Sequence, residues 1–121
     1  MIADRENNLV YVSDLLESRS PALVDGLRRI LCEHGVPLRV IRSTRDVWCR
    51  DFMPVQVAPG QFVRFCYAPD YLRGYERLIT RPDDIGPIPE VGRCVDSGIV
   101  LDGGNLVGWT HSFPPLEGHQ P

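Results

Sequence analysis

The sequence of 121 residues lacks lysine, lacks any Cys-x-x-Cys pair and lacks a long apolar run. Its thirteen basic residues are all arginine, and they are scattered among sixteen acidic residues at a net charge of −3. Without a basic patch we expect no nucleic-acid partner. No apolar stretch approaches the roughly 20 residues that a helix needs to cross a bilayer, so we expect no membrane partner. The four cysteines have no histidine at zinc-ligand spacing, and we expect no metal site and no cofactor.

The first residues also lack the apolar core of a secretory signal, because charged and amide side chains fill positions 4–8. This predicts a cytoplasmic location. In that compartment reduced cysteines are favoured over two disulfides. Cys32 and Cys66 stand in apolar runs and are predicted to be small core residues.

The length suits one domain. We predict an α/β module over residues 1–107 and a divergent, poorly ordered tail over residues 108–121.

The order of elements in the module predicts a mixed α/β fold. Apolar, β-branched runs predict strands, and one amphipathic helix is expected from Ser20 and Pro21 to a glycine stop at Gly35. Around Pro59 and Gly60 the alternation predicts a hairpin. The expected strands are 9–12, 38–41, 52–57, 61–67 and 97–101. The intervening 69–93 stretch, rich in Pro, Gly, Asp and Arg, predicts a long excursion with one helical turn near 72–79.

Two short signatures carry the chemistry, namely Trp48-Cys49-Arg50-Asp51 and Asp102-Gly103-Gly104-Asn105. A guanidinium is planar and permanently charged, so a carboxylate opposite it makes two charge-assisted hydrogen bonds. Asp51 and Asp102 are the candidate carboxylates. Trp48 is placed to lie over the same cation, which adds about 0.5 to 2 kcal/mol. The combination suits an arginine-like ligand.

The two signatures resemble those of the guanidine-modifying deiminase superfamily, closest to its agmatine deiminase and bacterial peptidylarginine deiminase branch. The 8–16 segment also looks like the family's first strand, and the 62–65 and 69–72 segments are similar to it. The resemblance covers roughly residues 8–107 and fades after Val107.

The resemblance implies a partial pentein-like β/α-propeller module, a mixed sheet with one main helix, which would form about the first module and part of the second in a ring around a substrate tunnel. It also implies substrate-binding roles for Trp48, Arg50, Asp51, Asp102 and Asn105. The family's catalytic His and Cys belong to later modules that this sequence lacks. We therefore expect a truncated deiminase-like module with no catalytic residue of its own.

Plainer interpretations stand beside each of these roles. Arg50 and Asp51 can form an internal ion pair, Trp48 can belong to the core, and the glycine pair can be only a turn. Cys49 is an alternative nucleophile with His34 or His111 as its base. His34 is otherwise expected to stabilise its helix end, and His111 and His119 to be solvent residues.

Three functional hypotheses follow from the sequence. The first is a truncated deiminase-like module that binds a guanidine without hydrolysing it. The second is a self-associating or protein-interaction module, because a fragment of a ring has open flanks, and this predicts a homo-oligomer. The third is one part of a split agmatine or arginine deiminase.

Overall fold

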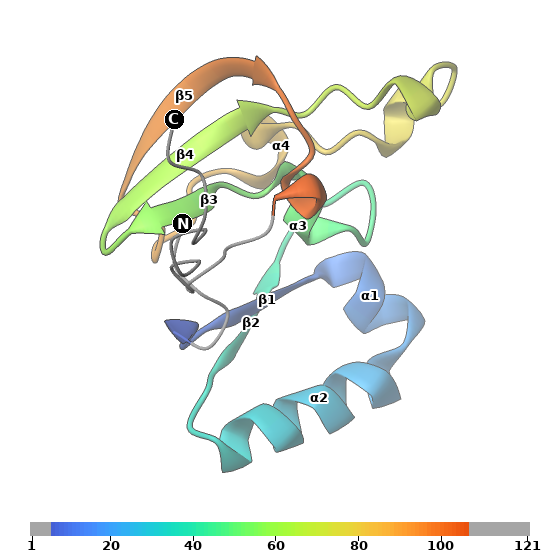
Figure 1. The fold of residues 1–121 in the computed structure, drawn as a ribbon. Coiled ribbons are helices and arrows are strands. Elements are labelled where there is room, and N and C mark those ends of the chain that lie inside the picture. Colours follow the sequence, from blue (N-terminus) through green and yellow to red (C-terminus); the bar gives the residue numbers. More distant parts are fainter. Residues whose placement is uncertain (1–5, 107–121) are drawn as a thin grey trace, which may run out of the picture.

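The computed structural model describes residues 6–106 as two small sheets with helices packed against them (Figure 1). The first half is a strand–helix–strand unit in which two parallel strands pair from Val10 opposite Leu38 to Ser13 opposite Ile41. Its elements are β1 (Val10–Ser13), α1 (Asp14–Arg19), α2 (Pro21–Glu33) and β2 (Leu38–Ile41). The strands 9–12 and 38–41 predicted from the sequence are thereby confirmed within one residue.

Helix α2 begins and ends at the predicted signals. Pro21 occupies the first turn, although the Ser20 side chain makes no capping hydrogen bond. At the other end Gly35 is left-handed with φ 68°. The amides of Gly35 and Val36 donate to the carbonyls of Cys32 and Leu31, which is the Schellman arrangement.

The apolar face of α2 is narrower than its sequence pattern predicts. Val24 is fully buried, and Leu27 and Leu31 pack beside it against the first sheet. Leu23 and Ile30, expected on the same face, are 61% and 57% exposed. The two-stranded sheet is too small to cover the whole apolar face of a 13-residue helix.

The loop after β2 is fixed to the start of α1 by one carboxylate. Asp14 accepts hydrogen bonds from the Ser43 amide at 2.8 Å, the Thr44 amide at 3.3 Å and the Thr44 hydroxyl at 2.5 Å. Burial opposes ionisation of Asp14, but the bonds from Thr44 and Ser43 outweigh it and lower its pKa. They also hold Ser43 at φ 61°, a conformation that is rare outside glycine. The loop therefore reaches Trp48 along a defined path.

The second half is a three-stranded mixed sheet in the order β3-β4-β5. β3 and β4 form the predicted hairpin, with Gly60 at φ 67° in its turn, and β5 runs parallel to β4. The elements are α3 (Cys49–Phe52), β3 (Val55–Ala58), β4 (Gln61–Cys66) and β5 (Arg93–Val100). The predicted strand start at Phe52 is wrong, since residues 49–52 form one helical turn and Pro54 delays the strand to Val55.

The connection from β4 to β5 contains more structure than the single turn that was predicted. It forms η2 (Asp70–Leu72), η3 (Glu76–Leu78) and the short helix α4 (Pro82–Ile85). The buried Thr80 hydroxyl accepts from the Arg45 amide at 2.9 Å, and the Arg45 side chain pairs with Asp84 at 2.9 Å. Farther along, Glu90 bonds Tyr11 and Arg39 of the first sheet. These contacts join the excursion to both halves of the fold.

Two apolar clusters form the core, one in each half. The first contains Val12, Val24 and Leu38, and the second contains Ile41, Cys49 and Phe52. The prediction of Cys32 and Cys66 as core residues is wrong, because both are exposed, on α2 and at the end of β4, and Cys49 is the buried one. All four cysteines are free thiols.

The mixed α/β class is confirmed, with α2 as its longest helix. Neither sheet closes on itself within residues 6–106. Over the same residues, no helix combines the length and the apolar character needed to cross a bilayer. The predicted 108–121 tail lies outside the described residues.

Candidate functional site

The site forms around α3, whose residues 49–52 alternate between the core and the surface. Cys49 and Phe52 point into the second apolar cluster, while Trp48 at the N-terminal cap is 66% exposed. Asp51 is half-buried on the remaining side of the turn. The interpretation of Trp48 as a core residue is therefore wrong.

The two sequence signatures pack directly against each other, since α3 contacts η4 (Gly103–Asn105). The Gly104 amide donates to Asp51 Oδ1 at 3.2 Å, and Arg50 Nη2 donates to the Leu106 carbonyl at 2.8 Å. A Cβ atom on Gly103 would lie 2.0 Å from the Arg50 carbonyl oxygen, and one on Gly104 would lie 2.4 Å from Asp51 Oδ1. Glycine is needed here for close approach of the backbones.

The interpretation of the glycine pair as only a turn misses this contact. Neither glycine needs left-handed backbone, because neither has a positive φ. The expected internal ion pair of Arg50 with Asp51 is not formed within residues 6–106, where Arg50 instead holds the Leu106 carbonyl. Arg50 thus acts as a clamp between the two signatures. Asn105 is exposed on η4, and its amide donates to the Asp102 carbonyl at 2.9 Å.

The two candidate carboxylates converge. Asp102 is half-buried at the N-terminal cap of η4, and its side chain makes no capping hydrogen bond. Burial raises its pKa above the ordinary value of 3.8, and the negative charges of Asp51 and Asp70 raise it further. A bound cation would relieve this repulsion.

Three residues of the site were missed by the sequence reasoning about roles, all from the segment after β4. Asp70 of η2 adds a third negative charge near Asp102. The Tyr67 ring packs on Phe52 with a centroid distance of 6.3 Å. Burial, an interaction with the Tyr71 hydroxyl and the charges of Asp51 and Asp102 all raise the Tyr67 pKa. The only sequence signal for them was the resemblance of the 69–72 segment.

A cavity of about 350 Å³ lies beside Asp51. Its walls combine apolar side chains of the first sheet and of α1 with the exposed indole of Trp48, and the carboxylate and Gly104 stand at its edge. The lining residues are Tyr11, Val12, Leu16, Val47, Trp48, Cys49, Arg50, Asp51 and Gly104. The cavity can hold an alkyl chain whose cationic end meets the acids.

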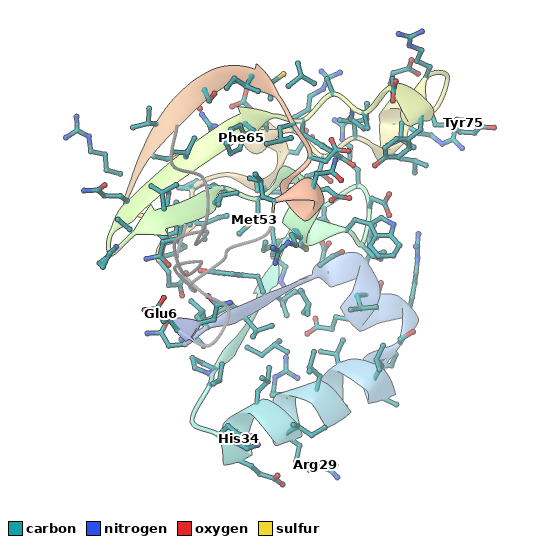
Figure 2. The ribbon with its side chains drawn as sticks, viewed as in Figure 1. Glu6, Arg29, His34, Met53, Phe65 and Tyr75 are labelled. Carbon is teal, nitrogen blue, oxygen red and sulfur yellow. The ribbon has the colours of Figure 1, made fainter. Side chains whose placement is uncertain are left out.

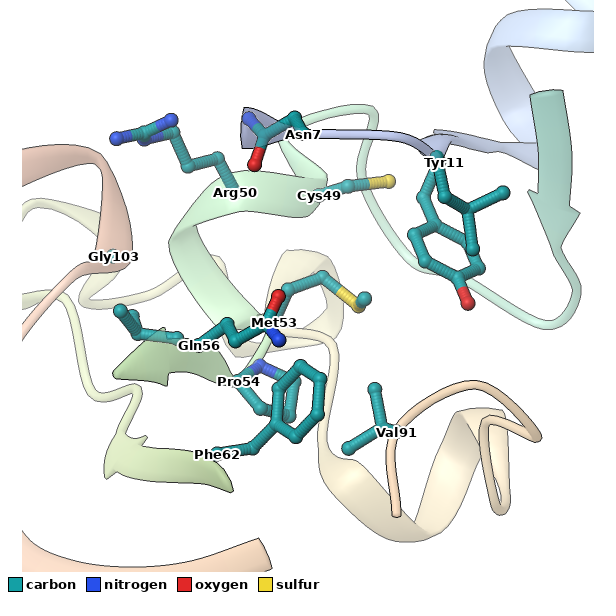
Figure 3. Close-up of a pocket in the computed structure, with 12 residues that line it drawn as sticks. Asn7, Tyr11, Cys49, Arg50, Met53, Pro54, Gln56, Phe62, Val91 and Gly103 are labelled. Carbon is teal, nitrogen blue, oxygen red and sulfur yellow. The ribbon is translucent and has the colours of Figure 1, made fainter. Parts of the chain in front are cut away.

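A second cavity, of about 280 Å³, lies along α3 between β1 and β3 (Figure 3). It is mostly apolar, with Met53, Pro54 and Phe62 among its walls, and Cys49 and Arg50 line both cavities. Burial raises the pKa of the Cys49 thiol to about 11, and the charge of Asp14 contributes. At neutral pH this thiol is protonated and a poor nucleophile.

Histidine is not part of the described site. His34 lies at the C-terminal cap of α2, at the far end of the first half from Met53 and α3 (Figure 2). It is therefore not the base of Cys49. His111 and His119 lie outside the described residues. Within residues 6–106, no group of three or more His, Cys, Asp or Glu side chains is arranged to hold a metal ion.

Comparisons of the chain with models of protein families, with curated proteins and with solved structures found no match. The deiminase resemblance therefore rests on the two signatures and on their geometry.

Proposed function

We propose that this chain binds a guanidinium-bearing small molecule between Asp51 and Asp102, and that it does not hydrolyse the ligand with its own described residues. The observation that carries the proposal is the convergence of the two carboxylates, which lie close enough for the charge of Asp51 to raise the Asp102 pKa. Asp51 Oδ1 is used by the Gly104 amide. Its Oδ2 accepts no hydrogen bond from residues 6–106 and is available to a ligand.

The surroundings favour a planar cation over a compact ion. No metal-binding group is found among the described side chains, whereas Trp48 offers an exposed aromatic face beside the acids. A guanidinium combines charge, parallel donors and a flat surface that stacks on an indole. An alkyl tail on the ligand would fill the apolar part of the cavity next to Trp48 and Asp51.

Hydrolysis of a guanidine requires a thiolate to attack its central carbon and a base to move protons. Cys49 is a protonated, buried thiol, and the described histidine is remote from it. The site therefore supplies charge and orientation only. Within the deiminase hypothesis, the chain corresponds to a β/α module of a pentein-like propeller that contributes the carboxylate side of a guanidine site.

Calorimetric titration of the purified chain with butylguanidine, agmatine and arginine tests the proposal, with butylammonium as the matched ligand without a guanidinium. We expect saturable binding of the guanidines and much weaker binding of butylammonium. Asp51→Asn keeps an oxygen that can accept from the Gly104 amide but removes the charge. Because a hydrogen bond to a charged group contributes about 1.5–3 kcal/mol, affinity should fall roughly tenfold or more.

Asp83→Asn is the control variant, because Asp83 is an exposed acid on α4 away from the cavity residues. It should bind like the unchanged protein. Circular dichroism of each variant separates lost binding from lost folding. Equal binding of butylammonium and butylguanidine, or no effect of Asp51→Asn, would contradict the proposal. Release of ammonia from agmatine would contradict its second part.

A further inference from the structure

We infer that the outer edge of β5 pairs, antiparallel, with the β5 edge of a second copy of this chain, and that Arg93 of each copy then meets Asp102 of the other. The proposal rests on the guanidinium preference of the Asp51–Asp102 site for its ionic part. The strand pairing itself rests on separate observations.

The first observation is an open sheet edge. β5 is the longest strand and pairs on one side with β4, and within residues 6–106 no strand occupies its other side (Figure 1). The backbone N–H and C=O groups along an open edge are a template for a further strand. Natural edge strands are often protected by lysine or proline, and residues 93–100 contain neither.

The second observation is the pattern of exposed apolar side chains on this strand. Val95, Ile99 and Val100 are 58%, 61% and 60% exposed. Two antiparallel copies of β5 centred on Ser97 would place each Val95 opposite Ile99 of the other copy, and each Cys94 opposite Val100. Residues directly opposite each other point to the same face of a sheet, so Val95 and Ile99 would form two apolar pairs.

The irregular pairing of β5 with β4 preserves this alternation. Between Arg64 and Cys66 of β4 there are two steps, and between their partners Asp96 and Val100 of β5 there are four. An even number of added residues keeps Val95 and Ile99 on one face. The register centred on Ser97 is therefore compatible with the strand as it is built.

The third observation is charge complementarity along the strand. β5 begins at the exposed Arg93, which pairs with no carboxylate within the described residues, and it leads into Asp102 with Asp51 and Asp70 nearby. Antiparallel pairing reverses one copy, so Arg93 would lie opposite Leu101 and next to Asp102 of the second copy. A guanidinium would then reach each acidic site.

The remaining charge on β5 does not oppose the pairing. Asp96 is bonded through both oxygens to Arg64 of its own chain, at 2.6 and 3.0 Å. In the register centred on Ser97 it would stand opposite Gly98 of the other copy. No two like charges meet across the pair, which is the condition for a stable cross-strand arrangement.

Sedimentation equilibrium of the full chain over a wide concentration range tests the inference. We expect a monomer–dimer equilibrium that Ile99→Asp abolishes, because the introduced charges would face apolar side chains. Ile30→Asp is the matched control, since Ile30 is 57% exposed on α2. It should dimerise like the unchanged chain. Circular dichroism checks that both variants fold.

Arg93→Ala tests the ionic part and should weaken the dimer about tenfold, whereas Arg29→Ala, an exposed arginine on α2, should not. Excess butylguanidine should weaken the dimer by competing for Asp102. A chain that binds butylguanidine but stays monomeric overturns the dimer while the proposed function stands. A dimer lost in Ile99→Asp but indifferent to Arg93→Ala and to butylguanidine overturns the ionic contact. A dimer unaffected by Ile99→Asp overturns the use of this edge.

Discussion

Substitution of Gly103 by alanine should separate the two signatures and destabilise the protein. Its new Cβ atom would lie 2.0 Å from the Arg50 carbonyl oxygen and 3.2 Å from the Arg50 carbonyl carbon. Both atoms belong to the backbone of α3, so no side-chain rotation can relieve the clash. α3 and η4 must move apart, which strains the bonds of Gly104 to Asp51 and of Arg50 to Leu106.

The expected cost follows from overpacking and from these two bonds. Forcing an extra methyl group into a close contact costs about 1–3 kcal/mol, and each hydrogen bond contributes about 1 kcal/mol. We expect Gly103→Ala to lower the free energy of unfolding by about 3 kcal/mol. For a chain of this size the melting temperature should fall by roughly 10 °C.

Gly104→Ala should behave differently, because its clash at 2.4 Å is with the end of the Asp51 side chain, which can rotate. We expect a stability loss of only about 1 kcal/mol, for the lost hydrogen bond. The displaced carboxylate should nevertheless weaken guanidine binding about tenfold. The two neighbouring glycines thus separate an effect on stability from an effect on binding.

Thermal and urea unfolding measured by circular dichroism, with titration of butylguanidine, check both variants. Gly26→Ala in α2 is the control, because its Cβ meets nothing within 4 Å. It should stabilise the protein by about 0.5–1 kcal/mol through helix propensity. Unchanged stability of Gly103→Ala would refute the close packing of η4 on α3, and with it the convergence of the carboxylates.

Three further measurements test the electrostatics and the core. Since the Asp102 pKa is raised, its proton stabilises the fold in acid, and this contribution is lost as pH rises through the folded pKa; guanidine affinity should increase over the same range, from about pH 4 upward, by calorimetry. With a pKa of about 11, Cys49 should react with a thiol reagent at neutral pH only upon unfolding, whereas the exposed Cys32 reacts at once. Val24→Ala should lower the free energy of unfolding by about 2 kcal/mol, against under about 0.5 for Leu23→Ala, in urea titrations.

Local sequence signals predicted the elements that depend on local physics. Pro21 and Gly35 marked both ends of α2, and Pro59-Gly60 marked the hairpin turn. The strands were found where β-branched residues gather. These features follow from backbone preferences of one or a few neighbouring residues, and tertiary contacts did not override them.

Tertiary contacts decided the features that the sequence reasoning missed. The burial of Cys49 and the exposure of Cys32 depend on which face meets the small first sheet, and an apolar neighbourhood in the sequence cannot specify that face. The contribution of Asp70 and Tyr67 to the site depends on the return of the 69–92 excursion across the structure. Spacing along the chain contains no signal for such a return.

The glycine pair explains why two signatures about fifty residues apart can act as one site. Gly103 permits the backbone of η4 to approach α3, and this approach places Asp102 within the electric field of Asp51. A larger residue at either glycine would separate the acids even if both were retained. The recognisable unit is therefore the pair of acids together with the glycines that bring them close. Because repulsion between the acids raises the Asp102 pKa, binding a cation would release strain that the fold maintains in the free protein. The same packing would then supply both the geometry of the site and its preference for a positive charge.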